Sequence, residues 1–217
     1  MRELGIPAFR AFPLILAAPS GAGKTTIARK LREHRADVVF SVSATTRPPR
    51  PHERHGRDYW FLAEDEFREQ VGAGELAEWA EVHGHLYGTP MENIRRAAEQ
   101  RQILLLDIDV QGARQIRAAV PGAVSVFILP PSGRELAGRL TSRGSEGEEV
   151  RRRRLTNACR EIAAAQEFDY VIVNDDLERA VGHVDAILRA ESARCAHLVG
   201  LAEYATRLCV DIESSLI

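Results

Sequence analysis

The chain has 217 residues, with 29 Lys and Arg against 31 Asp and Glu, so its formal charge at neutral pH is −2. A hydrophobic share of 45% excludes a disordered or fibrous protein, and the small net charge argues against a protein that binds polyanions through bulk charge. A chain of this length can bury a large core and needs no disulfides to fold.

The apolar pattern along the chain predicts strands that alternate with helices. Short apolar runs between turn residues predict buried parallel strands at 13–18, 103–106, 124–129 and 170–173, with a shorter candidate at 38–42. Helical patterns cover 25–33, 91–100, 111–119, 134–141, 151–166 and 177–208, the last of which is long enough for one helix or two. Such alternation predicts an α/β fold, with a mostly parallel sheet covered by helices on both faces.

The first strand leads into a glycine-rich sequence at residues 18–25, Ala-Pro-Ser-Gly-Ala-Gly-Lys-Thr. Its spacing is close to G-x-x-x-x-G-K-[ST], with alanine at the first glycine position, and this motif binds nucleotide phosphates. Gly21 and Gly23 let the backbone turn its N–H groups toward a phosphate, which Lys24 can also reach. The alternative is a chance glycine-rich turn, but a strand before and a helix after are the context that the motif requires. The predicted ATP phosphate ligands are Ser20, Gly21, Ala22, Gly23, Lys24, Thr25 and Thr26.

The segment 43–89 interrupts the alternation and predicts a small inserted subdomain. It is rich in proline, arginine, glycine and aromatic residues, with short strand-like pieces at 59–62 and 76–82. Arg47 and Arg50, which prolines flank, can clamp a phosphomonoester. Tyr59 and Tyr87 can add phenolic donors to the same phosphate.

Glu78 is a carboxylate in an otherwise apolar part of this segment. A carboxylate in a base pocket accepts from two adjacent N–H donors, which guanine offers at N1 and N2 and adenine does not. Ser43 and Thr89 could donate to the guanine O6. These residues therefore predict that the acceptor is a guanine nucleotide.

The strand predicted at 103–106 is followed by Asp107, at the place where P-loop proteins carry the acid that faces Mg²⁺. A capping aspartate at a strand end is the alternative. Beside the glycine-rich loop, the first interpretation is favoured. We therefore expect the chain to bind ATP or GTP with Mg²⁺, held by the Thr25 hydroxyl and by Asp107 through water.

Residues 138–154 are polar and spaced by glycines, and they end in four arginines, which predicts a mobile lid. The run 151–154 could be a nucleic-acid patch. However, acidic residues precede it, which is more typical of a solvated helix start, and we expect only Arg154 to face the site.

Three further features could have either a structural or a functional role. Trp60 and Trp79 are expected to pack in the core, with base stacking as the alternative. Cys159 is expected to be a small buried residue and not a nucleophile. His83-Gly84-His85 is interpreted as a turn in preference to a metal site, because no acidic or cysteine ligands lie at a fixed spacing from it.

Cysteine usage and hydropathy indicate the compartment. Cys159, Cys195 and Cys209 are widely spaced and contain no C-x-x-C pair, which fits neither a disulfide framework nor a zinc site and suits a reducing cytosol. The N-terminal residues resemble a signal peptide only faintly, and no apolar run is long enough to span a membrane. We expect a cytoplasmic protein that binds no membrane.

The ordered motifs resemble those of the guanylate kinase family over nearly the whole chain. The matching blocks are Ala18–Lys24, Ser41–Arg47, Gly56–Tyr59, Tyr87–Thr89, Leu106–Gly112 and Val171–Asp176. The resemblance implies transfer of the γ-phosphoryl of ATP to GMP, and also to dGMP, giving ADP and GDP in purine nucleotide metabolism. It implies a P-loop core at 1–42, 90–137 and 155–217, an inserted mixed α/β GMP-binding subdomain at 43–89 and a mobile helical lid at 138–154.

The resemblance also implies roles for individual positions. The implied guanine-reading residues are Ser43, Glu78, Thr89 and Asp109, and the implied GMP-phosphate ligands are Arg47, Arg50, Tyr59 and Tyr87. The implied catalytic residues are Lys24, Asp107, Arg139, Arg143 and Arg154, and Asn174 is expected near the adenine of ATP. One departure is His52, where the family usually has glycine. If that turn needs a positive φ, His52 is strained.

Two other functions fit the sequence less well. An inactive guanylate-kinase-like domain that binds phosphorylated peptides would typically lack the P-loop lysine or the lid arginines, which this chain retains. A P-loop kinase that phosphorylates a sugar phosphate would have no use for the base-reading residues. ATP and GMP are thus the expected small-molecule partners, with no nucleic acid and with a possible homo-oligomer.

Overall fold

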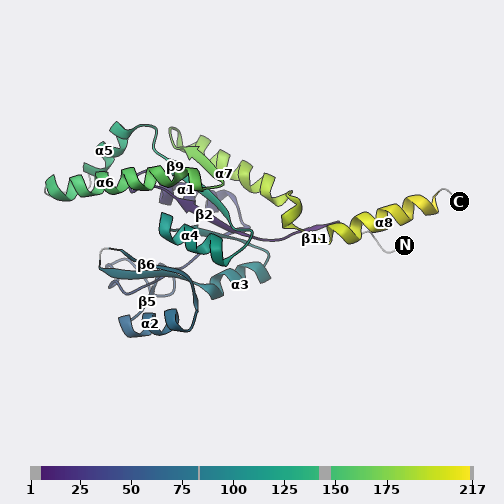
Figure 1. Ribbon diagram of the computed structural model, residues 1–217, viewed down its shortest axis with the longest axis horizontal. Helices are drawn as coiled ribbons and strands as arrows, with labels where there is room; N and C mark the ends of the chain where they lie inside the picture. The colour runs from purple at the N-terminus through teal and green to yellow at the C-terminus, as the bar shows by residue number, and fades with distance from the viewer. Residues whose placement is uncertain (1–5, 83, 142–147, 216–217) are drawn as a thin grey trace.

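A five-stranded parallel sheet forms the centre of the protein (Figure 1). The computed structural model describes residues 6–82, 84–141 and 148–215. The strand order is β10-β9-β2-β8-β3, and all four strand pairs are parallel. The bounds are β2 (Pro13–Ala17), β3 (Val38–Phe40), β8 (Ile103–Asp107), β9 (Val124–Leu129) and β10 (Tyr170–Val173). The five strands predicted from the sequence are therefore all present.

Helices cover both faces of this sheet because successive strand residues point to opposite sides. Leu14 and Leu16 of β2 pack in the cluster that contains α1 (Lys24–His34) and α7 (Leu177–Ser192). Ile15 points the other way, toward α3 (Met91–Glu99) and α4 (Val110–Ala119). The predicted α/β fold with helices on both faces is confirmed.

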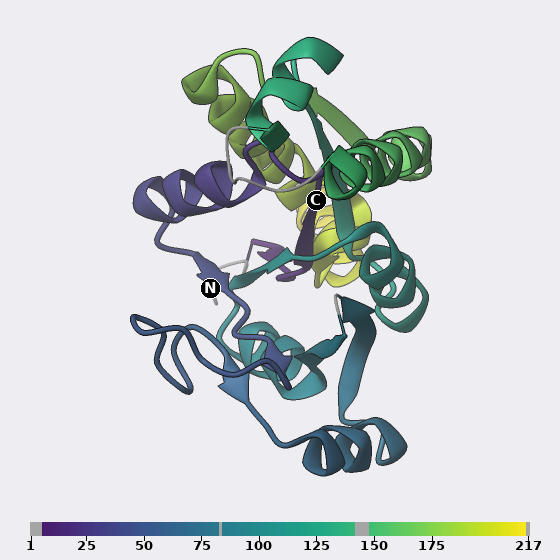
Figure 2. The ribbon, with the colours of Figure 1, turned by 90° about the vertical axis from the view of Figure 1, so that its left-hand side faces the viewer.

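A second, four-stranded sheet lies below the main sheet in Figure 2. Its order is β5-β4-β7-β6, and it is mixed, because β4 pairs parallel with β5 and antiparallel with β7. Phe67 of its helix is fully buried against Ala44 and Leu86 of the strands. The elements are β4 (Ala44–Thr45), β5 (Trp60–Phe61), α2 (Glu64–Gly72), β6 (Leu76–Val82) and β7 (His85–Pro90).

Two helices, α5 (Gly133–Thr141) and α6 (Glu148–Ala163), pack on each other through Leu136, Leu140 and Ala158. A short 3₁₀ turn, η1 (Ala164–Glu167), follows α6 and leads into β10. The segment predicted as a lid, 138–154, includes the end of α5 and the start of α6, and its residues 142–147 lie outside the described residues.

The C-terminal helical segment divides into two helices. α7 ends at Ser192 and is followed by η2 (Cys195–His197), β11 (Leu198–Val199) and α8 (Leu201–Ser214). β11 pairs antiparallel with β1 (Ala8–Phe9), and α8 extends away from the body of the molecule (Figure 1). Of the two alternatives for 177–208, two helices is correct. Among the described residues, no helix is long and apolar enough to cross a membrane.

Three side-chain expectations are wrong. Trp60 and Trp79 are 38% and 40% exposed, so neither tryptophan packs in the core. The Trp60 ring instead lies over Gly56, where a Cβ atom would approach it to 3.1 Å. Cys159 is exposed, because Ala158 is the residue that α6 turns toward α5.

Two loops have an ordinary backbone geometry over the residues that the structure describes. Gly84 has a φ of 79° in the turn between β6 and β7, as expected for a turn, while His83 lies outside the described residues. Among the residues that the structure covers, Arg101 is the one non-glycine with a positive φ. His52 therefore carries no left-handed strain.

Candidate functional site

The glycine-rich loop connects β2 to α1 and is supported by an asparagine from another strand end. Gly21 and Gly23 have φ values of 86° and 98°, and a Cβ atom at Gly23 would lie 2.4 Å from Asn174 Nδ2. Asn174 is buried, and its Nδ2 donates to the Ala22 carbonyl at 2.8 Å. Asn174 therefore holds the loop backbone, a contact that differs from the adenine contact the resemblance implies.

Lys24, Thr25 and Asp107 form a compact polar group at the end of the parallel sheet. Lys24 Nζ lies 2.8 Å from Asp107 Oδ1 and donates to the Ile108 carbonyl at 2.8 Å. The Thr25 hydroxyl donates to Asp107 Oδ2 at 3.2 Å. Because β2 and β8 are neighbours, with Leu16 in register with Asp107, the sheet order itself brings the strand-end acid to the loop.

The donor set at this position fits Mg²⁺. A threonine hydroxyl and an aspartate carboxylate lie side by side, and both are the hard oxygen ligands that Mg²⁺ prefers. Within the described residues, no cluster of three or more His, Cys, Asp or Glu could form a complete metal cage. That composition suits an ion whose other ligands are substrate phosphates and water.

The four-stranded sheet places a buried carboxylate over a small cavity. Glu78 is 6% exposed and accepts from the Thr89 hydroxyl at 2.7 Å, because β6 and β7 pair these two residues. Burial raises the pKa of Glu78 to about 7. The cavity of about 170 Å³ is lined by Lys24, Ser43, Tyr59, Glu78, Ala80, Val82, Tyr87, Gly88, Asp107, Ile108 and Asp109.

Asp109 and Gly112 shape the other side of this cavity. Asp109 caps α4, with its Oδ1 accepting from the Gly112 backbone N–H at 2.7 Å, which fixes the carboxylate at the start of the helix. A Cβ atom at Gly112 would lie 2.7 Å from Glu78 Oε2. Only glycine at this position lets the Glu78 carboxylate approach α4 so closely.

The predicted phosphate clamp is held together by Glu53. Arg47 Nη2 lies 2.8 Å from Glu53 Oε1, and the Arg50 backbone N–H donates to Glu53 Oε2 at 2.8 Å. Arg47 Nε also donates to the Tyr87 hydroxyl at 3.2 Å, and its guanidinium lies 5.4 Å from the centre of the Tyr59 ring. The Arg50 side chain is exposed. Hydrogen bonds from Arg47 and from the Arg50 backbone hold the pKa of Glu53 below its usual value, so the carboxylate stays charged.

Two cavities meet at the glycine-rich loop. A second cavity of about 390 Å³ is lined by Ala18, Pro19, Ser20, Gly21, Gly23, Lys24, Thr25, Thr26, Val82, Asp109 and Glu161. Both cavities share Lys24, Val82 and Asp109. Most of the residues predicted for the triphosphate therefore line one of two adjoining cavities, and Ser43, Glu78 and Asp109, predicted for the base of the acceptor, line the other.

The predicted lid arginines have different positions relative to this region. Arg139 of α5 donates to the Gly21 carbonyl at 3.3 Å and pairs with Glu135 at 3.1 Å. Arg154 lies half-buried on α6. Arg143 lies outside the described residues.

Three residues that take part in this geometry had no predicted role. Glu53 holds the clamp, Gly112 makes room for Glu78, and Glu161 of α6 lines the cavity beside the glycine-rich loop. Burial raises the pKa of Glu161. Glu53 lies only six residues after Arg47, and this proximity was the one sequence signal that could have suggested a contact.

The sheet order, the glycine-rich loop and the strand-end acid define a P-loop nucleotide-binding protein, and the cavity of about 170 Å³ beside Glu78 adds a place for an acceptor. A family model described as guanylate kinase matches residues 10–191. Guanylate kinase from Thermosynechococcus vestitus is 51% identical over 77% of this chain and 88% of its own length. Guanylate kinase from Chelativorans sp. is 46% identical over 93% of each chain.

A solved structure agrees with these sequence matches. The crystal structure of guanylate kinase from Anaplasma phagocytophilum superposes with a TM-score of 0.76 at 37% identity, covering 92% of this chain and 96% of that one. The chain belongs to the guanylate kinase family, whose members phosphorylate GMP to GDP with ATP. The predicted family, enzyme class and α/β P-loop fold are confirmed.

Proposed function

We propose that this chain transfers the γ-phosphoryl of ATP to GMP at the junction of the two cavities. The observation that carries the proposal is that both cavities share Lys24 and Asp109. ATP would place its phosphates along residues 20–26, while GMP would place its base beside Glu78 and its phosphate toward Arg47. Donor and acceptor phosphates would then meet at the Lys24 ammonium.

The clamp and base-reading residues support this choice of acceptor. Arg47, Arg50, Tyr59 and Tyr87 would bind the GMP phosphate, and burial raises the pKa of Tyr59, which keeps its phenol protonated as a donor. The proposed guanine-reading residues are Ser43, Glu78, Thr89 and Asp109. The Thr89 hydroxyl donates to Glu78, so it would act by orienting that carboxylate. None of these roles involves the ribose 2′-hydroxyl, and we therefore propose that dGMP is also a substrate.

Neutralisation of the negative charge on the transferring phosphoryl group would contribute most of the rate enhancement. Phosphoryl transfer has a loose transition state, which needs positioning more than covalent chemistry. Lys24, Arg139, Arg143 and Arg154 would face the transferred group. Thr25 and Asp107 would hold Mg²⁺, directly or through water, and the bound ion would supply positive charge to the β and γ oxygens. Residues 138–154 would close as a lid over the core, with 43–89 as the GMP-binding subdomain.

We also propose a role in purine nucleotide metabolism, which follows from GMP as the acceptor, and a cytoplasmic location, which the exposed thiols support. Cys159, Cys195 and Cys209 are free and exposed, and a reducing compartment keeps such thiols unpaired.

The function can be tested by an acceptor panel with purified protein and ATP. We expect rapid turnover of GMP, turnover of dGMP within about tenfold of it, and AMP and ribose 5-phosphate lower by about 10⁴-fold, as for a site that reads hydrogen-bonding groups. Chelation of Mg²⁺ should abolish turnover, and added Mg²⁺ should restore it. Equal turnover of AMP and GMP would contradict the assignment of the base pocket.

Glu53 is expected to act as a positioning residue for the phosphate clamp. Glu53→Gln keeps the shape but removes the charge that ties Arg47 to the Arg50 backbone. We expect the KM for GMP to rise roughly tenfold while the KM for ATP stays unchanged, because hydrogen bonds to charged groups contribute more than neutral ones. Steady-state kinetics measure both constants.

The control for this variant is Glu69→Gln, on the exposed surface of α2 in the same subdomain. It should leave both KM values unchanged. A Glu53→Gln protein with wild-type KM for GMP would show that the clamp keeps its shape without this carboxylate.

A further inference from the structure

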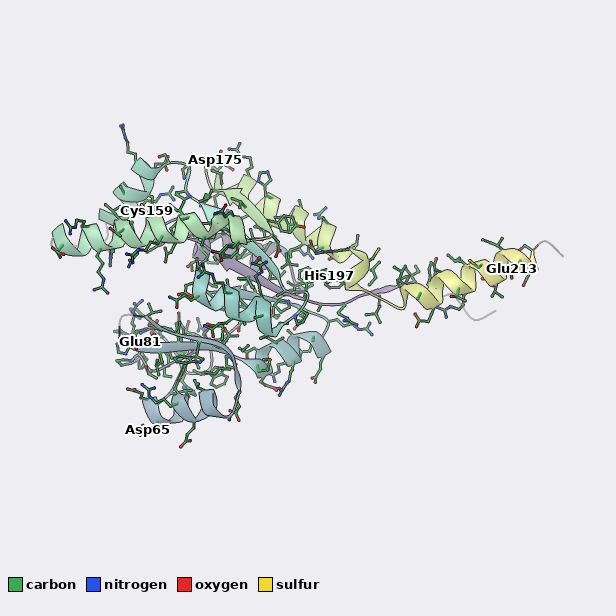
Figure 3. The ribbon with its side chains drawn as sticks, in the orientation of Figure 1. Asp65, Glu81, Cys159, Asp175, His197 and Glu213 are labelled. Atoms are coloured by element: carbon green, nitrogen blue, oxygen red, sulfur yellow. The ribbon has the colours of Figure 1, made fainter. Side chains whose placement is uncertain are left out.

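A carboxylate from α6, Glu161, lines the cavity of about 390 Å³ beside the glycine-rich loop. Figure 3 labels Cys159, which lies on the same helix two residues before it. Two residues correspond to about 200° around a helix, so the exposed Cys159 and Glu161 point in nearly opposite directions. The helix therefore turns the half-buried Glu161 inward, toward the place where the proposed function puts the ATP phosphates.

The charged residues of this cavity do not all favour a polyphosphate. Among the described residues that line it, Lys24 is the one cation, whereas Asp109 and Glu161 are both acids. The Lys24 ammonium also lies 2.8 Å from Asp107, so its charge is shared. Asp109 caps α4, but Glu161 belongs to neither the base-reading nor the catalytic residues. An additional carboxylate therefore lies where ATP would bring several negative charges.

The glycine-rich loop is a strong attractor for an anion. Gly23, the N-cap of α1, has no side chain that could accept from the backbone N–H groups, and the first turn of α1 contains no acidic residue. The positive end of the helix therefore attracts a negative charge from elsewhere. Burial raises the pKa of Glu161, but the Ser20 backbone N–H and the Lys24 ammonium oppose this rise, because both favour the charged carboxylate. Glu161 thus interacts with groups that are also predicted to bind phosphate.

We propose that the Glu161 carboxylate competes with the phosphates of ATP for the glycine-rich loop, and so weakens the binding of both ATP and ADP. This inference rests on the proposed function, because it takes ATP to bind along residues 20–26. The carboxylate repels the nucleotide before and after phosphoryl transfer alike. Removing such a repulsion strengthens binding uniformly, which lowers KM without raising kcat. The competing charge therefore favours release of the ADP product.

Removal of the charge should tighten nucleotide binding, whereas damage to the loop would weaken it. Glu161→Gln keeps the size of the side chain, and we expect its Kd for Mg²⁺-free ATP to be about tenfold below that of the wild type. The gain should be about threefold for ATP with Mg²⁺, because the ion offsets roughly half of the phosphate charge. Tripolyphosphate, which has no base, should also gain about tenfold. Isothermal titration calorimetry with the full chain measures all three Kd values.

Two further variants separate the charge from other effects. Glu161→Asp keeps the charge on a shorter side chain and should bind ATP no more tightly than the wild type. Glu33→Gln makes the same change in net charge on the exposed surface of α1, where Glu33 pairs with Arg29, and it should leave every Kd unchanged. In steady-state assays of GMP phosphorylation, Glu161→Gln should show a lower KM for ATP with a kcat no higher than that of the wild type.

The inference is overturned if Glu161→Gln binds Mg²⁺-free ATP with the wild-type Kd or more weakly. It is also overturned if Glu33→Gln tightens binding equally, or if Glu161→Asp binds as tightly as Glu161→Gln, because the charge at residue 161 would then not be the cause. Every Kd is measured without GMP and without turnover. A chain that binds ATP as expected but does not phosphorylate GMP would therefore contradict the proposed function alone.

Discussion

Replacing Lys24 by alanine is expected to lower kcat for GMP phosphorylation by about 100- to 1,000-fold or more, the usual effect of removing one preorganised charged donor. Lys24 follows directly on Gly23, and its Nζ lies beside Asp107 at the junction of the two cavities. Negative charge on the transferring group would build up at that junction, and no other lysine of the chain lies in the loop. Steady-state kinetics with saturating ATP and GMP measure the change.

The chain provides its own control, since Lys30 is the only other lysine. Lys30 pairs with Glu178 on the protein surface, and exposed ion pairs contribute little to stability. Lys30→Ala should therefore keep kcat within about twofold of the wild type. The melting temperature of Lys24→Ala should be measured as well, because the substitution removes the cation that pairs with Asp107. Retention of more than a tenth of the wild-type kcat by a folded Lys24→Ala protein would contradict the proposed role.

The centre of the parallel sheet could be predicted because β2, β8 and β9 are buried on both faces. Residues 14–16 and 103–106 are continuous apolar runs, and such runs are readable without knowing their neighbours. β1, β4 and β11 have two residues each, so they carry no periodicity and exist only through pairing with distant segments. α2 was also not predicted, because Phe67 is its single buried residue and one residue gives no helical stripe.

The candidate site could be predicted to the extent that ligand chemistry dictates residue types. Gly23 and Lys24 are recognisable because a phosphate demands that backbone and that charge in a fixed order. Glu53 and Gly112 were not recognisable, because their roles depend on contacts between segments. The Glu53 carboxylate joins Arg47 to the Arg50 backbone. The lack of a Cβ atom at Gly112 leaves room for the Glu78 side chain, which comes from another element. Trp60 was misjudged for a related reason, because size and hydrophobicity do not reveal that a ring lies on a surface glycine.

Glu78→Gln is expected to lower the preference for GMP over AMP by about 10³-fold or more, because the buried group would no longer match guanine. The carboxylate offers two acceptors to the N1–H and N2–H groups of guanine. Glutamine offers one acceptor and one donor, a pattern that adenine matches with its N6–H and N1. We therefore expect kcat/KM to fall for GMP and to rise for AMP, measured in the same coupled assay.

Glu81→Gln is the matched control, because Glu81 lies on the same strand β6 but is exposed. It should leave the ratio of kcat/KM for GMP and AMP unchanged. ATP affinity should stay constant in both variants, since the proposed ATP ligands lie in residues 20–26. If Glu78→Gln kept the wild-type preference for GMP, another residue would have to read the base.

The pH dependence of GMP binding tests the same carboxylate without relying on turnover. Burial raises the pKa of Glu78 to about 7, so the free enzyme holds the neutral acid below that pH. The neutral acid cannot accept two hydrogen bonds from guanine, and the dissociation constant for GMP should rise by about tenfold between pH 8 and pH 6. The GMP phosphate also titrates near pH 6. The Glu78→Gln protein keeps that phosphate titration but lacks the carboxyl, so its profile isolates the contribution of Glu78.

Glu78→Gln should weaken GMP phosphorylation without lowering the stability of the folded protein at pH 8. Because the folded-state pKa of Glu78 lies above the usual value of 4.5, the folded protein binds this proton more tightly than the unfolded chain. Wild-type stability should therefore fall as the pH rises from about 4.5 through 7, where the buried group becomes charged. Glu78→Gln removes that penalty, so at pH 8 its melting temperature should equal or exceed that of the wild type. A lower melting temperature would mean that the charged carboxylate stabilises the fold. Stability alone would then explain why Glu78 is buried, without guanine recognition.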